Sequence, residues 1–232
     1  MIISVVIPTF NEIKNGYLKK SLHALTQKEN VEVIVVDNMS TDGTAQLAQE
    51  YHVKLYQDKL PSRAERLKHG ILKAKGDIIL LHHPRSVLSI EALNELEQTT
   101  ANWGAFRHEF DKSHPLLKFT SFYSNFVRGG RGIFYLDHCI FFKRDFAPDV
   151  LKLKNMEIFE DTEISLILRA KAKPRLLKST STTSAIRFEK NGVFKQILLN
   201  QKMKILYHLG RHHQEMNRNY EQNLGLNNDF DA

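Results

Sequence analysis

The chain has 232 residues, of which 42% are hydrophobic and 25% charged, a composition typical of a soluble globular protein with one large α/β domain or two small ones. A formal net charge of +7 suits anionic partners such as nucleotides, phosphorylated substrates or an anionic membrane face, without choosing among them. The single cysteine, Cys139, excludes an intramolecular disulfide, and its apolar surroundings argue against thiol catalysis.

The chain carries no recognisable targeting or spanning segment. No stretch approaches the roughly 20 apolar residues of a membrane span, and the first residues lack the charged region and cleavage site of a signal peptide. A lone cysteine fits a reducing compartment. We therefore expect a cytoplasmic protein.

Apolar strands and amphipathic helices alternate through the first hundred residues. The expected elements are a strand over 2–7 that stops at Pro8, a helix with leucines at helical spacing, a strand over 31–36, a helix from about 42, a short strand over 53–56, a helix over 64–74 and a buried strand over 77–81. This alternation predicts an α/β fold with a Rossmann-like, doubly wound, mostly parallel sheet.

The pattern changes after Trp103. Residues 118–146 are rich in aromatic, basic and glycine residues and indicate a second functional half. Acidic residues at 160–163 complement the start of a helix that ends before Pro174. We expect a last amphipathic helix over 193–209 and a mobile polar tail over 211–232.

Asp37 stands where the second strand ends and a polar turn begins. In open α/β sheets ligands bind at this edge, because side chains there clear the buried layers and helix N-termini point toward the same place. Asp37 is therefore a candidate ligand contact. A carboxylate at this position can equally serve to satisfy the amides of the turn.

Four motifs, in this order, resemble those of the family 2 glycosyltransferases of the GT-A fold. They are Val5 to Glu12, Val33 to Thr44, Gly76 to Leu81, and Phe159-Glu160-Asp161. Further matches point to a small soluble branch of the family: Trp103-Gly104, His114 to Leu117, Thr182 to Ala185 with Arg187, and Gly192-Val193. The resemblance covers residues 2–210 and implies one domain over 1–210, with a nucleotide-sugar half over 1–100 and an acceptor half over 101–210.

The resemblance implies a nucleotide site in the first half. The family's loop after the first strand wraps the base and ribose of a nucleotide sugar, which assigns this role to Pro8, Thr9 and Glu12. Asp37 would accept the N3–H of a uracil ring, so a uridine diphosphate sugar is the expected donor. Arg63 matches the arginine beside the pyrophosphate. Glu12 could instead cap a helix, and lone helical arginines are usually solvated.

The same resemblance assigns the chemistry to Asp161. Inverting transfer needs a base that removes the proton of the acceptor hydroxyl, and an ionised carboxylate suffices. Glu160 would be its neighbour, and Asp137 matches an aspartate of the acceptor region. The simpler alternatives are two acids that serve a helix N-terminus and a turn residue before a strand.

One motif departs from the family pattern. Where the family places the carboxylate that holds a divalent metal, this chain has Pro84, in the run His82 to Arg85. Mn2+ and Mg2+ favour oxygen ligands, so histidines replace that carboxylate poorly, and strand alternation lets only one of them, expected to be His82, line the site. Lys68 also stands where the family usually has asparagine.

Three explanations of this departure compete. Arg85 with Arg63 or Arg187 could neutralise the departing diphosphate without metal. A metal could be held by His82 with Asp137 or His138. The protein could also be a catalytically inactive nucleotide-sugar-binding protein of the same fold.

The sequence thus predicts a glycosyltransferase that moves a sugar from a nucleotide-diphosphate sugar, with inversion, to a sugar or lipid-linked acceptor bound by residues 104–190. The basic, aromatic stretch over 119–144 is expected beside the acceptor and in peripheral contact with an anionic membrane at its inner face. Nucleic acid is not an expected partner, because no recognisable binding module is present.

Overall fold

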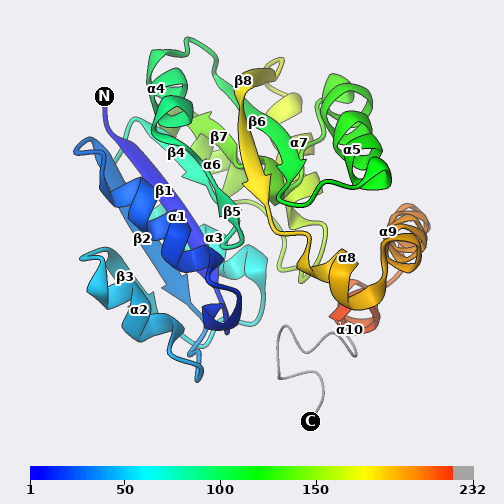
Figure 1. Cartoon of the computed structure of the whole chain (residues 1–232). Helices are drawn as coiled ribbons and strands as arrows, with labels where there is room; N and C mark the ends of the chain where they lie inside the picture. Colours follow the sequence, from blue (N-terminus) through cyan, green and yellow to red (C-terminus); the bar gives the residue numbers. More distant parts are fainter. Residues whose placement is uncertain (222–232) are drawn as a thin grey trace.

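A single mixed sheet runs through both halves of the chain in the computed structural model, which describes residues 1–221 (Figure 1). Its strands are β1 (Ile3–Thr9), β2 (Val31–Asp37), β3 (Lys54–Gln57), β4 (Ile78–Leu81), β5 (Ser86–Val87), β6 (Trp103–Phe110), β7 (Ile140–Lys143) and β8 (Arg175–Thr183). The strand order is β3-β2-β1-β4-β7-β6-β8-β5.

The first four strands in this order are parallel, as the alternation of strands and helices predicts. β7 pairs antiparallel with both β4 and β6, and thereby joins the two halves into one sheet. β6 and β8 are parallel, and the short β5 pairs antiparallel with β8. Gly104 lets β6 approach β8, since a Cβ there would lie 1.9 Å from the Arg175 carbonyl oxygen.

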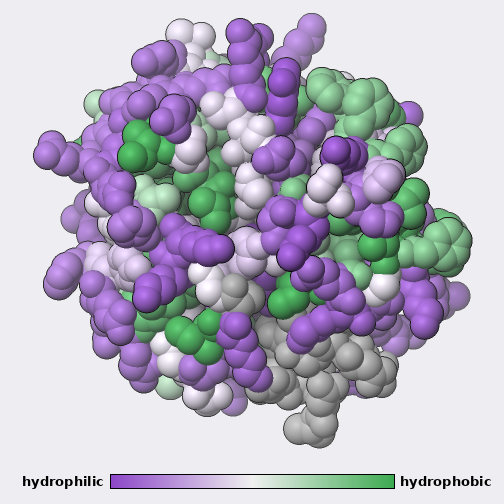
Figure 2. All heavy atoms as spheres, in the orientation of Figure 1, coloured by the Kyte–Doolittle hydropathy of each residue, from purple (hydrophilic) through white to green (hydrophobic). Residues whose placement is uncertain are grey.

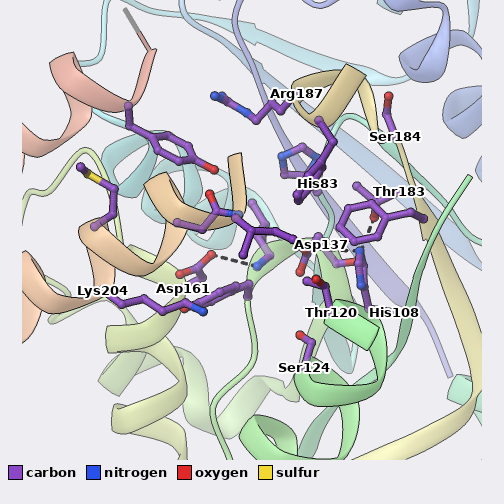
Figure 3. A pocket seen from close by; sticks show the side chains of 18 of the residues that line it. His83, His108, Thr120, Ser124, Asp137, Asp161, Thr183, Ser184, Arg187 and Lys204 are labelled. Carbon is purple, nitrogen blue, oxygen red and sulfur yellow. Dashed lines mark hydrogen bonds and ion pairs between the residues drawn. The ribbon is translucent and has the colours of Figure 1, made fainter. Parts of the chain in front are cut away.

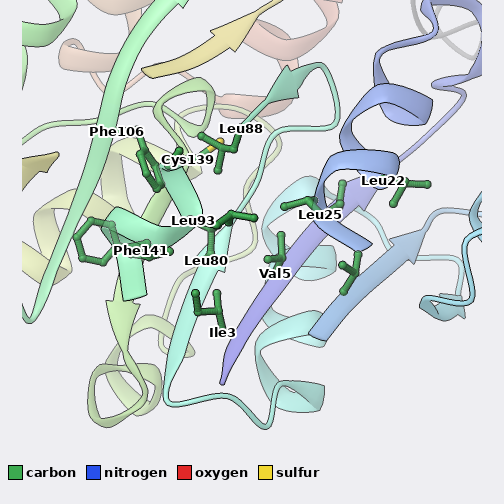
Figure 4. Packing of buried hydrophobic residues seen from close by; sticks show 14 of the residues in the cluster. Ile3, Val5, Leu22, Leu25, Leu80, Leu88, Leu93, Phe106, Cys139 and Phe141 are labelled. Carbon is green, nitrogen blue, oxygen red and sulfur yellow. The ribbon is translucent and has the colours of Figure 1, made fainter. Parts of the chain in front are cut away.

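Helices cover both faces of the sheet, which confirms the doubly wound α/β architecture. They are α1 (Tyr17–Thr26), α2 (Thr44–Glu50), α3 (Arg63–Lys73), α4 (Ile90–Gln98), α5 (Pro115–Phe122), α6 (Ala147–Val150), α7 (Glu160–Arg169), α8 (Ile186–Asn191), α9 (Val193–His208) and α10 (His213–Glu221). Apolar residues of α1, α2 and α4 pack on one face (Figure 4), and those of α3, α6 and α7 pack on the other.

Strand β1 continues through Pro8 to Thr9, two residues beyond its expected end at Ile7. The Val6 carbonyl accepts from His82 of the β4 side, whereas the Thr9 carbonyl accepts from Asn38 of the β2 side. Successive residues of a strand direct their backbone groups to opposite neighbours, so the Pro8 nitrogen faces β4, as the Val6 carbonyl does. The last residue of β1 that is paired with β4 is Val6, so Pro8 lies beyond the paired part of the two strands. A residue without an N–H therefore breaks no ladder hydrogen bond at this position.

The beginning of the expected mobile tail is a helix in the structure. Helix α10 packs against α9, and Met216 is buried between them together with the apolar residues before α7. Two large apolar side chains four residues apart, Met216 and Tyr220, give too weak a pattern to show this helix in the sequence. The rest of the expected tail, 222–232, lies outside the described residues.

Candidate active site

Two connected cavities open beyond the ends of the central strands. The smaller, of about 340 Å³, lies beside the loops that follow β1, β2 and β4. The larger, of about 600 Å³, lies between α5, α8, α9 and the start of α7 (Figure 3). Both are lined by Arg63, His83, Arg85, Ile158, Arg187 and Tyr220. The cavities are therefore two lobes of one cleft.

Asp161 lies in the wall of the larger cavity, at the start of α7. The chain enters this helix through Phe159, whose backbone is left-handed with φ of 66°. The backbone N–H groups of Leu136 and Thr162 donate to the Asp161 carboxylate at 2.9 and 2.7 Å. Burial and the charge of Glu160 outweigh the opposing effect of Arg63 and raise the pKa of Asp161 to about 7.

Glu160, the other acid of the pair, turns away from Asp161 to form an ion pair with Arg63. Its side chain is fully buried. Burial acts to lower the pKa of Arg63, but Glu160 and Asp161 outweigh it and raise that pKa above its usual value. Arg63 is held at the first turn of α3, which Ser62 caps by accepting from the Glu65 N–H.

The other two predicted phosphate-side arginines also face carboxylates. Arg85 makes a bidentate pair with Glu12, with nitrogen to oxygen distances of 2.7 and 3.1 Å, and both side chains are buried. Arg187 pairs with Glu221 at 2.5 Å, and its guanidinium lies 4.6 Å from the centre of the Tyr220 ring. Within residues 1–221 each of these arginines thus has one acidic partner.

A fourth arginine of the smaller cavity, Arg66, was missed in the sequence. It follows Arg63 by three residues, so both lie on one face of α3. Its Nε has no hydrogen-bond partner among the described residues, and it forms no ion pair there. Burial and the charge of Arg63 lower the pKa of Arg66 to about 10, which still leaves it cationic at neutral pH.

The structure places His83, and not the expected His82, in the cleft. His83 lines both cavities, whereas His82 is fully buried and lines neither. The Arg85 N–H donates to His83 Nδ1 at 3.1 Å, so the ring proton of neutral His83 lies on Nε2. Burial and the nearby arginines lower the pKa of His83 well below its usual range, which keeps the ring neutral. His83 can therefore act as a hydrogen-bond donor.

Asp37 and Thr9 do not line the smaller cavity, although their neighbours Pro8 and Asn38 do. Asp37 and Thr9 are both fully buried, and the Thr9 hydroxyl donates to the Asp37 carboxylate at 2.9 Å. The other contacts of Asp37 come from Ser40, whose N–H and hydroxyl donate to it at 2.8 and 2.5 Å. In this conformation Asp37 satisfies its turn, as the simpler reading of the sequence allows, while Pro8 and Glu12 reach the cavity.

The predicted acceptor residue Asp137 lines the larger cavity, as do His108, Arg128 and Lys204 from other elements. Its Oδ2 lies 3.5 Å from His108 Nε2, and its Oδ1 has no hydrogen-bond partner among the described residues. Burial acts to raise the pKa of Asp137, but the nearby imidazoles and the Arg128 guanidinium outweigh it and lower that pKa to about 2. Lys204, from α9, was not identified in the sequence.

The residues at the family's metal position do not fit a divalent cation. Pro84 offers no ligand atom, His82 is out of reach of the cleft, and the Nδ1 of His83 is already engaged. Across residues 1–221 no three His, Cys, Asp or Glu side chains are grouped to hold a metal ion. The alternative site of His82 with Asp137 or His138 is thus not formed.

Residues 4–151 match the model of a protein family described as glycosyl transferase family 2. The chain belongs to this glycosyltransferase family. A curated relative from Methanococcus voltae, a dolichyl N-acetyl-alpha-D-glucosaminyl phosphate 3-beta-D-2,3-diacetamido-2,3-dideoxy-beta-D-glucuronosyltransferase, is 24% identical over 69% of this chain. The chain spans 57% of the length of that relative.

Solved structures show the same fold as this family 2 glycosyltransferase. Staphylococcus aureus TarS 1-349 in complex with UDP-GlcNAc matches with a TM-score of 0.63 and 18% identity, over 79% of this chain and 58% of that one. The Pyrobaculum calidifontis mannosyltransferase PcManGT, in complex with GDP-Man and Mn2+, matches with a TM-score of 0.61 and 14% identity, over 94% and 63% of the two chains. The predicted family and GT-A fold are confirmed.

Proposed function

We propose that this chain transfers a sugar from a nucleoside diphosphate sugar, with uridine diphosphate as the expected nucleotide, to an acceptor hydroxyl with inversion. Asp161 carries the proposal. It is a buried carboxylate in the wall of the larger cavity, next in the chain to Glu160, whose partner Arg63 lines both lobes. A pKa of about 7 suits a general base at neutral pH.

The transfer is a single displacement. The acceptor oxygen attacks the anomeric carbon from the face opposite the diphosphate, and its proton passes to Asp161. The bond between the anomeric carbon and the phosphate oxygen breaks as the new glycosidic bond forms, and the nucleoside diphosphate leaves with the electron pair. Glu160 remains paired with Arg63, and its charge raises the pKa of Asp161.

The smaller cavity takes the nucleotide in this proposal. Pro8 and Glu12 line it, as does Asn38, the neighbour of Asp37 in the chain. Release of the Ser40 hydroxyl would free one acceptor position on Asp37 Oδ1 for the N3–H of uracil, while Thr9 keeps its hydrogen bond to the same oxygen. The UDP-GlcNAc named with TarS supports uridine, whereas the GDP-Man named with PcManGT shows that the fold also takes guanosine.

Cationic side chains carry the diphosphate charge in this proposal. Arg63, Arg85 and Arg187 line both lobes where the diphosphate must lie, and Arg66 lines the smaller one without an ion-pair partner among residues 1–221. Preorganised donors in a water-excluded cleft stabilise developing negative charge strongly. His83 can add a neutral donor through Nε2. PcManGT is named with Mn2+, but no step here is assigned to a metal, since the residues present do not fit one.

A donor screen tests the proposal. Hydrolysis and transfer are followed for several nucleotide sugars with and without Mn2+, for wild type, Asp161→Asn and the exposed control Asp145→Asn. We expect turnover in wild type and in Asp145→Asn. Asp161→Asn should lose about 100-fold or more in kcat, with nucleotide affinity within a few-fold of wild type, because an amide cannot accept the proton.

Two results would contradict the proposal. Full turnover in Asp161→Asn would remove this residue as the base. Tight nucleotide binding without turnover for any donor would instead leave the alternative of a non-catalytic nucleotide-sugar-binding protein.

We also propose that the protein makes peripheral contact with an anionic membrane face from the cytoplasm. Phe119, Phe122 and Phe126 are 65%, 56% and 50% exposed. The surface is narrower than the predicted 119–144, because Arg144 donates to carbonyls at the end of α3 and before β4. No helix within residues 1–221 is long and apolar enough to cross a bilayer.

Co-sedimentation with anionic vesicles at low and physiological salt tests this contact. We expect binding that weakens as the salt concentration rises. Absence of binding at both salt concentrations would contradict it.

A further inference from the structure

Two cations inside the larger cavity have no acidic partner within residues 1–221. Arg128 stacks on the Tyr135 ring, 3.4 Å from its centre, and bonds Ser124. Lys204 has neither a hydrogen bond nor an ion pair with the described residues. Burial and the charge of Arg128 outweigh the opposing effect of Asp137 and lower the pKa of Lys204 to about 8. Asp137 acts electrostatically on both cations but forms an ion pair with neither, so one carboxylate faces two cations. This arrangement favours a further anionic group in the space between them.

An apolar wall leads from these cations to the surface. It consists of Leu116, Phe119, Phe188, Phe194 and Ile197, from α5, α8 and α9. Phe119 and Phe194 are 65% and 67% exposed although they line the same cavity, so the wall continues onto the outside of the protein. Figure 2 shows apolar residues gathered over α5 and α9 on this side of the molecule.

Two chain segments carry all of this wall except Phe188, and both have charge of one sign. Residues 112–136 and 190–214 contain nine lysines and arginines and no aspartate or glutamate, in a chain with 26 acidic residues. An apolar surface with mostly basic residues around it complements an anionic lipid surface, where hydrocarbon and negative headgroups occur together.

We propose that the acceptor is a hydroxyl-bearing sugar joined through a phosphate to a long hydrocarbon chain; this identification of the acceptor rests on the transfer reaction proposed above. The sugar hydroxyl lies at Asp161, the phosphate oxygens lie at Lys204 and Arg128, and the hydrocarbon leaves the cavity between Phe119 and Phe194. Asp137, whose Oδ1 is unpartnered within the described chain, accepts a hydrogen bond from a further sugar hydroxyl. Figure 3 shows Asp161 and Lys204 on one side of the cavity, and Asp137 and His108 on the other.

The test measures binding of the anionic lipid group without any turnover. Calorimetry compares farnesyl phosphate, farnesol and inorganic phosphate on the full chain. We expect farnesyl phosphate to bind at least about tenfold more tightly than either of the others, because only it offers both the charge and the chain. Equal binding of farnesol would overturn the anion site, and equal binding of inorganic phosphate would overturn the hydrocarbon path.

Matched variants locate the two parts of the site. Lys204→Gln should lose about tenfold or more in farnesyl phosphate affinity, while Lys202→Gln, exposed on the same helix and outside the cavity wall, should keep it. Phe194→Ser should lose affinity for farnesyl phosphate, while Leu198→Ser, also exposed and outside the wall, should not. An equal loss in a variant and its control would overturn the assigned site, provided that all four variants melt as wild type does.

The outcome is separable from that of the transfer reaction. If no donor is turned over while farnesyl phosphate binding depends on Lys204 and Phe194, the transfer proposal fails and the lipid site stands. If transfer depends on Asp161 while farnesyl phosphate binds no better than farnesol, the lipid acceptor is wrong and the transfer stands.

Discussion

The cations shared by the two lobes differ in their partners from the cations that belong to one lobe. Arg63, Arg85 and Arg187 line both lobes, and each pairs with a carboxylate of the chain itself. Arg66 in the smaller lobe, and Arg128 and Lys204 in the larger lobe, form no ion pair within residues 1–221. In the proposed reaction, a diphosphate would replace the carboxylates at the shared arginines, whereas an anion at the other three cations would displace no ion-pair partner.

The largest effect is expected when the ion pair of Arg63 with Glu160 is removed. Arg63→Met leaves Glu160 fully buried with no cation, so we expect a loss of about 3 kcal/mol or more in the free energy of unfolding. Urea denaturation measures the free energy of unfolding. Lys59→Met, which changes an exposed residue in a loop, is the control. A loss below about 1 kcal/mol would mean that the pair is solvated like a surface ion pair.

The pH dependence of turnover tests whether the charge of Glu160 raises the pKa of Asp161. Only ionised Asp161 can accept a proton, and its pKa is about 7, so kcat/KM should fall about tenfold for each pH unit below that value. Glu160→Gln removes a charge that raises this pKa, and the midpoint of the pH profile should move to lower pH. An unmoved midpoint, or one shifted upward, would contradict the assignment.

The same pKa predicts the sign of a stability effect. Folding raises the pKa of Asp161 from 3.8 to about 7, so the folded state keeps this proton where the unfolded state has lost it. The contribution of Asp161 is therefore fully present below about pH 4 and is lost as pH rises through 7. Asp161 therefore contributes least to the stability of the fold at the pH where it is ionised and can act as the base.

Pro84→Asp would add to the smaller lobe the charge that the family normally places there. With a carboxylate at this position we expect Mn2+ to raise the turnover of the variant a few-fold, and to leave wild type unchanged. Assays with and without Mn2+ measure this, and Ser89→Asp, at an exposed position outside both cavities, is the control. No response to Mn2+ in Pro84→Asp would show that more than one ligand has been lost.

The smallest expected effect is at Glu221. Glu221→Gln removes the anion that competes for Arg187, and UDP should then bind about threefold more tightly. Calorimetry of wild type, Glu221→Gln and the exposed control Glu215→Gln, on the same helix, measures the change. Weaker binding of UDP to Glu221→Gln would mean that the carboxylate orders the site and does not compete with the nucleotide.

The sequence predicted the sheet and the place of Asp161 because both depend on local patterns. A buried strand followed by a polar turn, and acids at a helix start, are visible within ten residues. Strand alternation showed that only one of His82 and His83 could face the cleft, but it does not say which face of the sheet meets the cleft. Arg66 could have been found from its spacing to Arg63. Lys204 gave no local signal, because only the packing of α9 brings it beside residues far away in the chain.

Because Glu221 belongs to the same chain as Arg187, it is a counter-ion that cannot diffuse away. A tethered group acts at an effective concentration in about the millimolar range, independent of the medium. When the nucleoside diphosphate departs, the carboxylate can return at once, so the guanidinium need not wait for a dissolved ion. We expect dissociation of the product and re-formation of the pair of Arg187 with Glu221 to be one kinetic event.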